Sequence, residues 1–369
     1  MILRTPHYFH RFKCTASFCR DNCCRGGWQI DIDDETVKKY GQLEGDIKEK
    51  INSALQYTDV SCFALKNGAC PFLDEDGLCS VYQELGEEYM GIVCRQFPRF
   101  AEYYGGIKEM GIGLACEEAA RIILTDDGNF SFEQTIINEE EYDDAEYDDV
   151  LAERLFFLRS YFFDLLNNRT IPLKNKLTEI IKIAAATQEH INKNEYAQIA
   201  PHDYDVEKIP FSEEYVKEIW YIYSGLEILN EEWSKKTDEI FKVIHPNDSD
   251  NTKAYLERTA ALNRFSDEKL YTNLAAYYIY RYFMKSAYDH NVFGKIQLLI
   301  SSLVIIKDLE LMDFLKKNRT DTQSLLDGIH IFSRETEYSE DNIEELYEEF
   351  VFGNGMGKEE LISIAEAVM

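Results

Sequence analysis

The placement of the cysteines is the feature that most constrains this chain. All nine lie between residues 14 and 116 of a 369-residue sequence, and residues 117–369 contain none. Cysteines used only as small buried side chains would be expected throughout the sequence. The N-terminal third is therefore predicted to be a metal- or cluster-binding unit. The nine are Cys14, Cys19, Cys23, Cys24, Cys62, Cys70, Cys79, Cys94 and Cys116.

The composition is that of a globular protein, with 45% hydrophobic and 13% aromatic residues. The formal net charge is −29. So acidic a surface repels phosphate, which argues against nucleic acid as a partner, and it suits partners that present lysine. A chain of this length has room for roughly two domains.

The sequence predicts a cytoplasmic protein without a transmembrane segment. Its N-terminus has neither the apolar core nor the small-residue cleavage site of a signal peptide. The longest apolar run, residues 296–306, is shorter than the about 20 residues that span a bilayer. Thiols stay reduced in the cytoplasm, so we expect these cysteines to bind metal rather than to form disulfides.

Eight cysteines lie in blocks beside glycine, proline and turn residues, as in loops that wrap metals. Cys62 is equally compatible with a buried position. Cys23 and Cys24 are adjacent, so either one ligates and the other supports it, or each faces a different site. Thiolates select zinc, copper(I) or iron–sulfur clusters, and the irregular spacing leaves zinc and iron–sulfur both open. The predicted ligands are Cys14, Cys19, Cys23, Cys24, Cys70, Cys79, Cys94 and Cys116.

The hydrophobic pattern predicts a mainly α protein in two parts. Residues 1–130 are predicted to form a small cysteine-rich metal-binding domain with short strands, including a helix from Glu35 to Leu55. The acidic run 131–150 is predicted to be a linker. Residues 151–369 are predicted to form an α-helical bundle that recognises the substrate.

Motifs along nearly the whole chain match one known family. The cysteine region carries Pro6-His7-Tyr8, Cys19-x3-Cys23-Cys24, Gly27-Trp28-Gln-Ile-Asp31, Cys70-Pro-Phe-Leu, Cys94-Arg95-x-Phe-Pro98-Arg99 and Cys116-x-Glu-Ala-Ala-Arg121. The helical region adds Leu166-Asn-Asn-Arg169 and Tyr277-Tyr-Ile-Tyr-Arg281. With these motifs the sequence resembles the flagellin lysine N-methylases, within a wider group of cysteine-rich metal-chelating domains.

The resemblance implies an enzyme that transfers methyl groups from S-adenosylmethionine to lysine side chains of flagellin. It also implies a [4Fe–4S] cluster held by cysteines, with zinc as the alternative. Ordinary signatures for the methyl donor are absent. Gly111-Ile-Gly113 has Cys116 where a third glycine belongs, and Gly26 stands where a radical enzyme's third cysteine would lie. Two other functions stay open: a structural-zinc adaptor, or an iron–sulfur redox or sensor protein.

Two arginines beside a predicted ligand are candidates for binding the methyl donor. Arg95 and Arg99 lie close to Cys94 in the sequence. Guanidinium groups bind carboxylates in a bidentate manner, so this pair could hold the carboxylate of S-adenosylmethionine. The alternatives are charge compensation of an anionic thiolate cluster and a structural ion pair.

Tyr277 and Arg281 are the candidates for a catalytic role. On a helix they share a face with Asn273. Aromatic rings there could cage a methylated ammonium group by cation–π attraction, and a tyrosine could accept the proton of lysine. The alternative is a core helix whose tyrosine hydroxyls bond to neighbouring groups.

Overall fold

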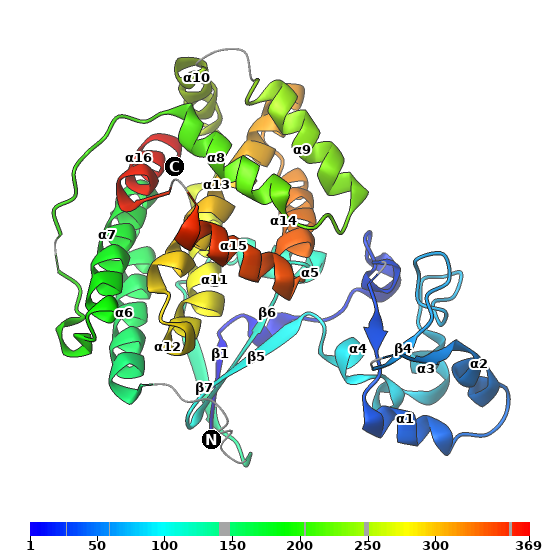
Figure 1. The fold of residues 1–369 in the computed structure, drawn as a ribbon. Helices are drawn as coiled ribbons and strands as arrows, with labels where there is room; N and C mark the ends of the chain where they lie inside the picture. Colours follow the sequence, from blue (N-terminus) through cyan, green and yellow to red (C-terminus); the bar gives the residue numbers. More distant parts are fainter. Residues whose placement is uncertain (27, 59, 140–147, 203, 247–250, 354–355) are drawn as a thin grey trace.

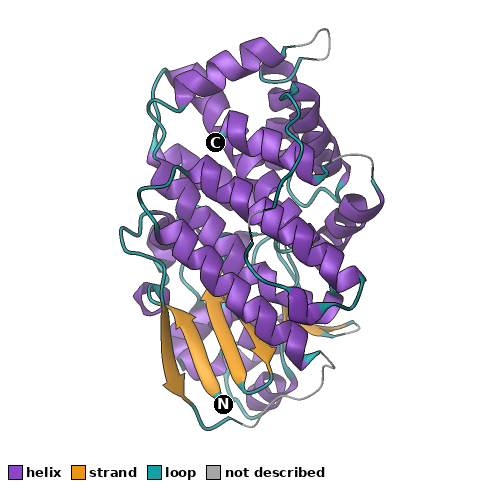
Figure 2. Ribbon diagram, turned by 90° about the vertical axis from the view of Figure 1, so that its left-hand side faces the viewer, coloured by secondary structure: helices purple, strands orange, loops and turns teal. Residues whose placement is uncertain are grey.

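The structure, a computed structural model, describes residues 1–26, 28–58, 60–139, 148–202, 204–246, 251–353 and 356–369. Most of the chain forms a body of packed helices with a small sheet at one end (Figure 2). A separate small lobe stands beside this body (Figure 1). The predicted mainly α architecture is confirmed.

Four strands form the sheet, in the order β5-β6-β1-β7. β1 (Ile2–Pro6) pairs in parallel with β6 (Ile107–Ile112) and antiparallel with β7 (Phe132–Ile136). β5 (Arg99–Tyr104) forms a hairpin with β6. Because β1 precedes the small lobe and β5 follows it, the lobe is an insertion between two strands of the same sheet.

We define the small lobe as residues 23–96. Asp33 caps its first helix by accepting a hydrogen bond from Thr36 N at 2.9 Å. The predicted helix from Glu35 to Leu55 is wrong as a single element: a turn ending at Gly45, with a φ of 77° that glycine adopts easily, divides it in two. Its elements are η3 (Cys23–Arg25), β2 (Ile30–Asp31), α1 (Asp34–Gly41), α2 (Asp46–Ala54), β3 (Leu55–Tyr57), β4 (Ser61–Phe63), α3 (Ser80–Leu85), η4 (Glu87–Tyr89) and α4 (Ile92–Gln96).

The helical body packs around α13, which is buried along most of its length. No helix of the described ranges combines the length and apolar character that a membrane span requires. The helices of the body are α5 (Glu117–Leu124), α6 (Asp149–Asn167), α7 (Leu173–Asn192), α8 (Glu213–Gly225), α9 (Glu231–Val243), α10 (Thr252–Leu262), α11 (Glu268–Tyr282), α12 (Ser286–Asp289), α13 (Val292–Lys317), α14 (Thr322–Thr336), α15 (Glu340–Phe352) and α16 (Lys358–Val368).

The described residues form two hydrophobic cores, which divide at the edges of the inserted lobe. One core lies within the small lobe, between Ile30 and Val81. The other fills the helical body and includes Tyr8, Ile112 and Leu124 from the N-terminal third. The sheet and α5 therefore pack with the helices. Independent folding of residues 1–130 and 151–369 stays a prediction.

A buried ion-pair cluster fixes the sheet to α6. Arg159 donates to both carboxylate oxygens of Glu109 on β6, at 2.7 and 2.5 Å, and Arg4 on β1 donates to the same group at 3.0 Å. Arg159 is 1% exposed and Glu109 2%. Charges this deeply buried need their partners, so the strand pairing and the position of α6 depend on each other.

The predicted acidic linker, residues 131–150, is described only at its ends. Phe132–Ile136 form the edge strand β7. Asp148 caps α6 by accepting a hydrogen bond from Leu151 N at 3.0 Å. Residues 140–147 lie outside the described residues, and the linker stays a prediction.

Candidate functional site at the junction of lobe and body

The first cysteine loop, residues 14–22, lies against the helical body. Arg20 Nε donates to Glu117 Oε1 on α5 at 2.7 Å. Asp21 bonds to His330 Nε2 on α14 at 2.6 Å, and this hydrogen bond lowers the pKa of Asp21 to about 2. These contacts hold the loop on the side of the body that faces the small lobe (Figure 1).

Four thiols gather where this loop meets α5. Cys23 interacts most strongly with the adjacent Cys24 and also with the charges of Cys14 and Cys116, and the charges of Cys19 and Cys14 act on Cys116. Cys116 is the N-cap residue of α5. Burial raises its pKa to about 11, against the opposing effect of backbone N–H groups in the first turn. We call Cys14, Cys19, Cys23 and Cys116 the interface thiols.

The other four predicted ligands gather inside the small lobe. Cys70 belongs to its core, and Cys24, Cys79 and Cys94 pack against the same core. Cys70 N donates to Cys24 O at 2.7 Å, and Cys79 pairs with Leu73 in an isolated antiparallel bridge. Burial raises the pKa of Cys70 and of Cys94 to about 12, and neighbouring thiols contribute to both shifts. We call Cys24, Cys70, Cys79 and Cys94 the lobe thiols.

The donor chemistry of both sets fits a thiophilic metal or an iron–sulfur cluster, because each offers four thiols. All nine cysteines are free of disulfides. As they stand, however, no three His, Cys, Asp or Glu side chains in the described ranges are placed to hold a metal ion. The thiols lie within electrostatic range rather than at ligand distance, and their assignment as ligands stays a prediction. Cys62 is buried on β4, outside both sets.

A buried charge cluster lies beside the interface thiols. Arg281 on α11 donates to the Tyr277 hydroxyl at 2.7 Å and lies 3.4 Å from the Glu337 carboxylate. Glu337 accepts from Tyr277 at 2.7 Å and from Tyr282 at 2.8 Å. A Cβ at Gly113 would lie 2.8 Å from Arg281 Nη1. Glycine at this position therefore lets the loop before α5 approach the cluster.

Arg281 itself occupies the aromatic surroundings predicted to cage a methylated lysine. Its guanidinium carbon lies 4.7 Å from the ring centre of Phe100, 5.3 Å from that of Tyr282 and 5.9 Å from that of Tyr277. Burial raises the pKa of Tyr277 well above its ordinary value, and its hydroxyl donates to Glu337. A neutral, bonded phenol is a poor proton acceptor, so Tyr277 and Arg281 suit a positioning role better.

An aromatic stack that the sequence analysis missed joins the lobe to the body. Trp28 stacks on Tyr338, which follows α14, with ring centres 5.8 Å apart, and Phe97 lies 5.4 Å from Tyr338. Arg334 on α14 lies 4.7 Å from the Trp28 ring centre. Burial raises the pKa of Tyr338, and two interface thiols add to the shift, which places Tyr338 beside them. Trp28 was visible within a family-like motif, whereas Glu337 and Tyr338 carried no motif.

In the described part of the chain, no carboxylate lies at ion-pair distance from the guanidinium group of Arg95 or of Arg99. Arg99 donates to Arg95 O at 3.4 Å, and its guanidinium carbon lies 5.1 Å from the Phe12 ring centre. Arg95 Nε is buried without a hydrogen-bond partner. The predicted alternative of a structural ion pair is therefore not seen. Binding of a carboxylate and compensation of thiolate charge stay open.

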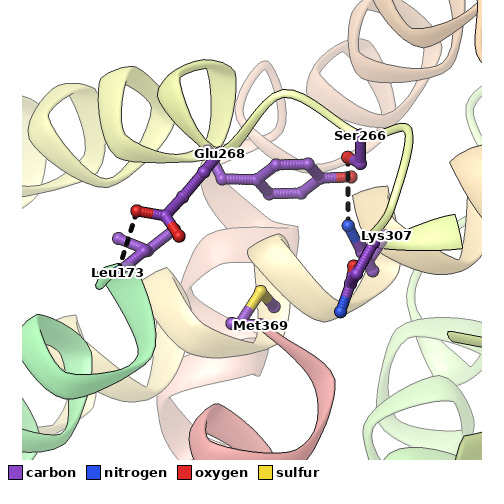
Figure 3. A pocket seen from close by; sticks show the side chains of 7 residues that line it. Leu173, Ser266, Glu268, Lys307 and Met369 are labelled. Carbon is purple, nitrogen blue, oxygen red and sulfur yellow. Dashed lines mark hydrogen bonds between the residues drawn. The ribbon is translucent and has the colours of Figure 1, made fainter. Parts of the chain in front are cut away.

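Two cavities lie away from this junction. One, of about 60 Å³, lies beside the buried Lys307, which donates to Ser266 at 3.1 Å (Figure 3). It has room for a few water molecules and is much smaller than the about 300 Å³ or more of a typical ligand pocket. The other, of about 540 Å³, is on the small lobe, and its lining includes Asp31, Asp34, Tyr57, Ile92 and Val93.

Comparison with known proteins gives a consistent picture. Residues 159–364 match the family described as FliB lysine N-methylase C-terminal domain. A lysine-N-methylase of Salmonella typhimurium is 28% identical over 198 residues, which are 50% of this chain and 47% of that protein. A lysine-N-methylase of Salmonella choleraesuis is 27% identical with the same coverage.

A third relative covers a shorter stretch. The flagellar biosynthetic protein FliU of Salmonella muenchen is 33% identical over 133 residues, which are 33% of this chain and 76% of that protein. The chain spans about half the length of the two lysine-N-methylases. No solved structure matches.

Proposed function

This chain belongs to the FliB lysine N-methylase family, whose matched region covers more than half of it, and we propose that it methylates lysine side chains of flagellin. S-adenosylmethionine is the proposed methyl donor, and a [4Fe–4S] cluster on the cysteine thiols is the proposed cofactor, with zinc as the alternative. The names of the relatives support lysine as the acceptor and a flagellar role. The net charge of −29 suits a protein substrate that presents lysine.

The observation that carries this proposal is the meeting of two regions at one junction. The family match, residues 159–364, contains α11 and α14 but no cysteine. These two helices supply Arg281 and Arg334, and Tyr338 directly follows α14 beside the interface thiols. The part of the chain that matches the family thus places buried charged side chains next to the part that is predicted to bind metal.

Methyl transfer of the polar kind needs lysine as a neutral amine. The nitrogen lone pair forms the new N–C bond while the C–S bond of the sulfonium donor breaks and sulfur keeps the bonding electrons. The ordinary pKa of lysine is about 10.4. Burial and nearby cations both favour the neutral amine. At this junction the rings of Trp28 and Tyr338 would contribute burial, whereas the charges of Arg281 and Arg334 are offset by Glu337 and Asp21. We therefore propose burial as the main influence, with the lysine releasing its proton to solvent before it attacks.

The residues at the junction also have defined roles toward the donor and the cofactor. Arg95 and Arg99 are the proposed partners of the donor's carboxylate, because their guanidinium groups lack a contact carboxylate of their own among the described residues. Four of the eight predicted cysteine ligands would hold the cluster. A bound cluster would supply a binding site for the donor or an electron.

The test is methyl transfer by the full-length protein, purified without oxygen and reduced. With S-adenosylmethionine and purified flagellin, peptide mass spectrometry should show lysine residues heavier by one methylene mass per transferred methyl group. Flagellin incubated without the donor is the control. Unchanged lysine masses with metal-loaded protein would overturn the proposal and favour a zinc adaptor or a redox protein.

A further inference from the structure

The eight predicted ligands fall into two sets of four that face different parts of the molecule. The interface thiols lie between the first cysteine loop and α5, and the lobe thiols lie in and against the core of the small lobe. We propose that the protein holds two separate metal sites: one on the lobe thiols that stabilises the small lobe, and one on the interface thiols that faces the junction. This inference rests on the metal binding in the proposed function and extends it, since neither set is assigned elsewhere.

The lobe thiols are joined by the backbone as well as by proximity. Cys70 N donates to Cys24 O at 2.7 Å, and Leu73 N donates to Cys70 O at 3.2 Å. Leu73 in turn pairs with Cys79. Cys94 feels the charges of the other three lobe thiols, so every member is close to the rest. The four thiols therefore connect the first, second and third cysteine blocks within one core.

The residues around the lobe thiols contribute to the fold of the small lobe. Tyr40 lies close to Cys70, Cys79 and Cys94, whose charges act on its hydroxyl. That hydroxyl donates to Tyr89 O at 2.8 Å, within the lobe. A site in these surroundings would stabilise the fold of the lobe, as closed four-cysteine sites commonly do.

The interface thiols have contacts of a different kind. Cys116 packs against the core of the helical body, not against the lobe core. Arg20, next to Cys19, donates to Glu117, next to Cys116, and this contact closes the loop onto α5. Tyr338 lies beside Cys23 and Cys116. A metal on this set would therefore lie next to the junction cluster of Arg281 and Glu337.

Adjacent cysteines divide the two sets. Cys23 and Cys24 are the first residues of the short turn η3, and Asn22 caps it by accepting a hydrogen bond from Cys24 N at 2.9 Å. Apart from each other, Cys23 is close to Cys14 and Cys116, whereas Cys24 is close to Cys70, Cys79 and Cys94. The Cys23 and Cys24 thiols also lie within hydrogen-bonding range of each other, so the two sets meet at this pair. A single zinc ion or [4Fe–4S] cluster takes four protein ligands, and each set supplies four.

The test is metal, iron and sulfide analysis of full-length protein purified without oxygen. We compare wild type with Cys70→Ser and Cys94→Ser in the lobe set and with Cys14→Ser and Cys116→Ser in the interface set. Each variant should lose the metal of one site: about half of the total if both sites bind the same group, or one metal entirely if they differ. Cys62 is buried outside both sets, so Cys62→Ser is the matched control and should keep all of its metal, iron and sulfide.

Three outcomes would overturn the inference. Loss of all metal in each of the four variants would show one shared site. Full retention of metal in both variants of one set would show that this set binds no metal. A wild type without metal would also overturn the cofactor part of the proposed function. Flagellin methylation is scored separately, so a failure of the two-site inference is distinguishable from a failure of the enzyme assignment.

A second measurement uses only wild-type protein, in case a variant does not fold. Metal is withdrawn with increasing chelator, and exposed thiols are alkylated and located by peptide mass spectrometry. The interface thiols and the lobe thiols should become reactive in two separate steps. Simultaneous modification of all eight would contradict two sites.

Discussion

The core of the small lobe consists, among the described residues, of ten buried side chains, whereas the core of the helical body extends from Tyr8 to Val368. A single core in a unit of fewer than about 70–80 residues rarely supplies more than about 3–5 kcal/mol. The lobe therefore needs a further source of stability, and its four gathered thiols offer one. The helical body has enough apolar burial to accommodate charges in its interior, such as Asp308 and Arg159.

Removal of a lobe thiol should give the largest difference in stability between the small lobe and the helical body. A structural zinc can contribute about 10 kcal/mol or more to folding, so Cys70→Ser should unfold the part of the small lobe from α1 to α4 and leave the interface thiols and the helical body in place. Limited proteolysis should then cut within residues 34–96 and spare α13. Cys62→Ser should resist cleavage like wild type. A resistant lobe in Cys70→Ser would show that it folds without metal.

A buried carboxylate gives the largest expected effect in the helical body. Asp308 accepts hydrogen bonds from Trp220 at 2.8 Å and from Tyr255 at 2.8 Å, and bonds to His245 at 2.7 Å. Breaking a buried ion pair of this kind costs about 3–5 kcal/mol. We expect Asp308→Asn to lower the free energy of unfolding of the body by that amount without loss of metal from the lobe.

The matched control for Asp308→Asn is a carboxylate on the same helix. Asp313 is partly exposed and pairs with Lys317 one turn away, at 2.8 Å. Exposed pairs contribute about 0–1 kcal/mol, so Asp313→Asn should change stability little. Equal effects of the two substitutions in denaturant unfolding would contradict the importance of the buried network.

The sequence predicted the helical body better than the junction. Helices are visible from apolar residues at helical spacing, and α11 appeared with Asn273, Tyr277 and Arg281 on one face. That shared face is confirmed, because Asn273 donates to Leu124 O, Leu114 N donates to Tyr277, and Arg281 lies against Gly113. The sequence could not show that Arg281 itself lies among these aromatic rings, because that position depends on how the helices pack.

The cysteine region shows the same limit. The adjacent pair Cys23 and Cys24 raised the possibility of two sites, but spacing could not say which distant thiol each one faces. That depends on the return of the chain through α4 and the sheet, which brings Cys94 into the lobe and Cys116 to the body. The break at Gly45 was missed because the apolar spacing continues across it. Glu337 and Tyr338 were missed because only the position of α14 makes them neighbours of the thiols.

The aromatic stack gives a smaller effect that sharpens the role of the junction. Tyr338→Ala removes the ring that stacks on Trp28, and stacking of this kind contributes about 0.5–1.5 kcal/mol. We expect flagellin methylation to fall about tenfold, while Tyr338→Phe, which keeps the ring, retains most of it. Tyr57→Ala, at an exposed position on the small lobe, is the control. Unchanged activity in Tyr338→Ala would place the reaction elsewhere.

The smallest expected effect is a pH dependence within the helical body. His245 bonds to Glu213 at 2.8 Å and to Asp308 at 2.7 Å. Burial alone would lower the pKa of His245, but the two carboxylates outweigh it and the pKa is raised. Protonated His245 therefore adds stability that is complete below about pH 6.5, the ordinary histidine pKa, and is lost as pH rises through the folded value.

Thermal unfolding at a series of pH values tests this dependence. The midpoint for wild type should fall as pH rises above about 6.5, with about 1.4 kcal/mol lost per unit of pKa shift. His245→Asn should be less stable and should lack this slope, although Glu213, Lys217 and Tyr255 remain nearby. An identical slope in the variant would assign the dependence to another group.

The central claim is that the small lobe depends on metal at its thiols whereas the helical body does not. Hydrogen exchange measured by mass spectrometry on the full-length protein, before and after chelation without oxygen, tests it most directly. The account predicts that amides of α1 to α4 lose protection while those of α13 keep it. Equal loss of protection in both parts, or none in the lobe of a protein shown to have lost its metal, would contradict the claim.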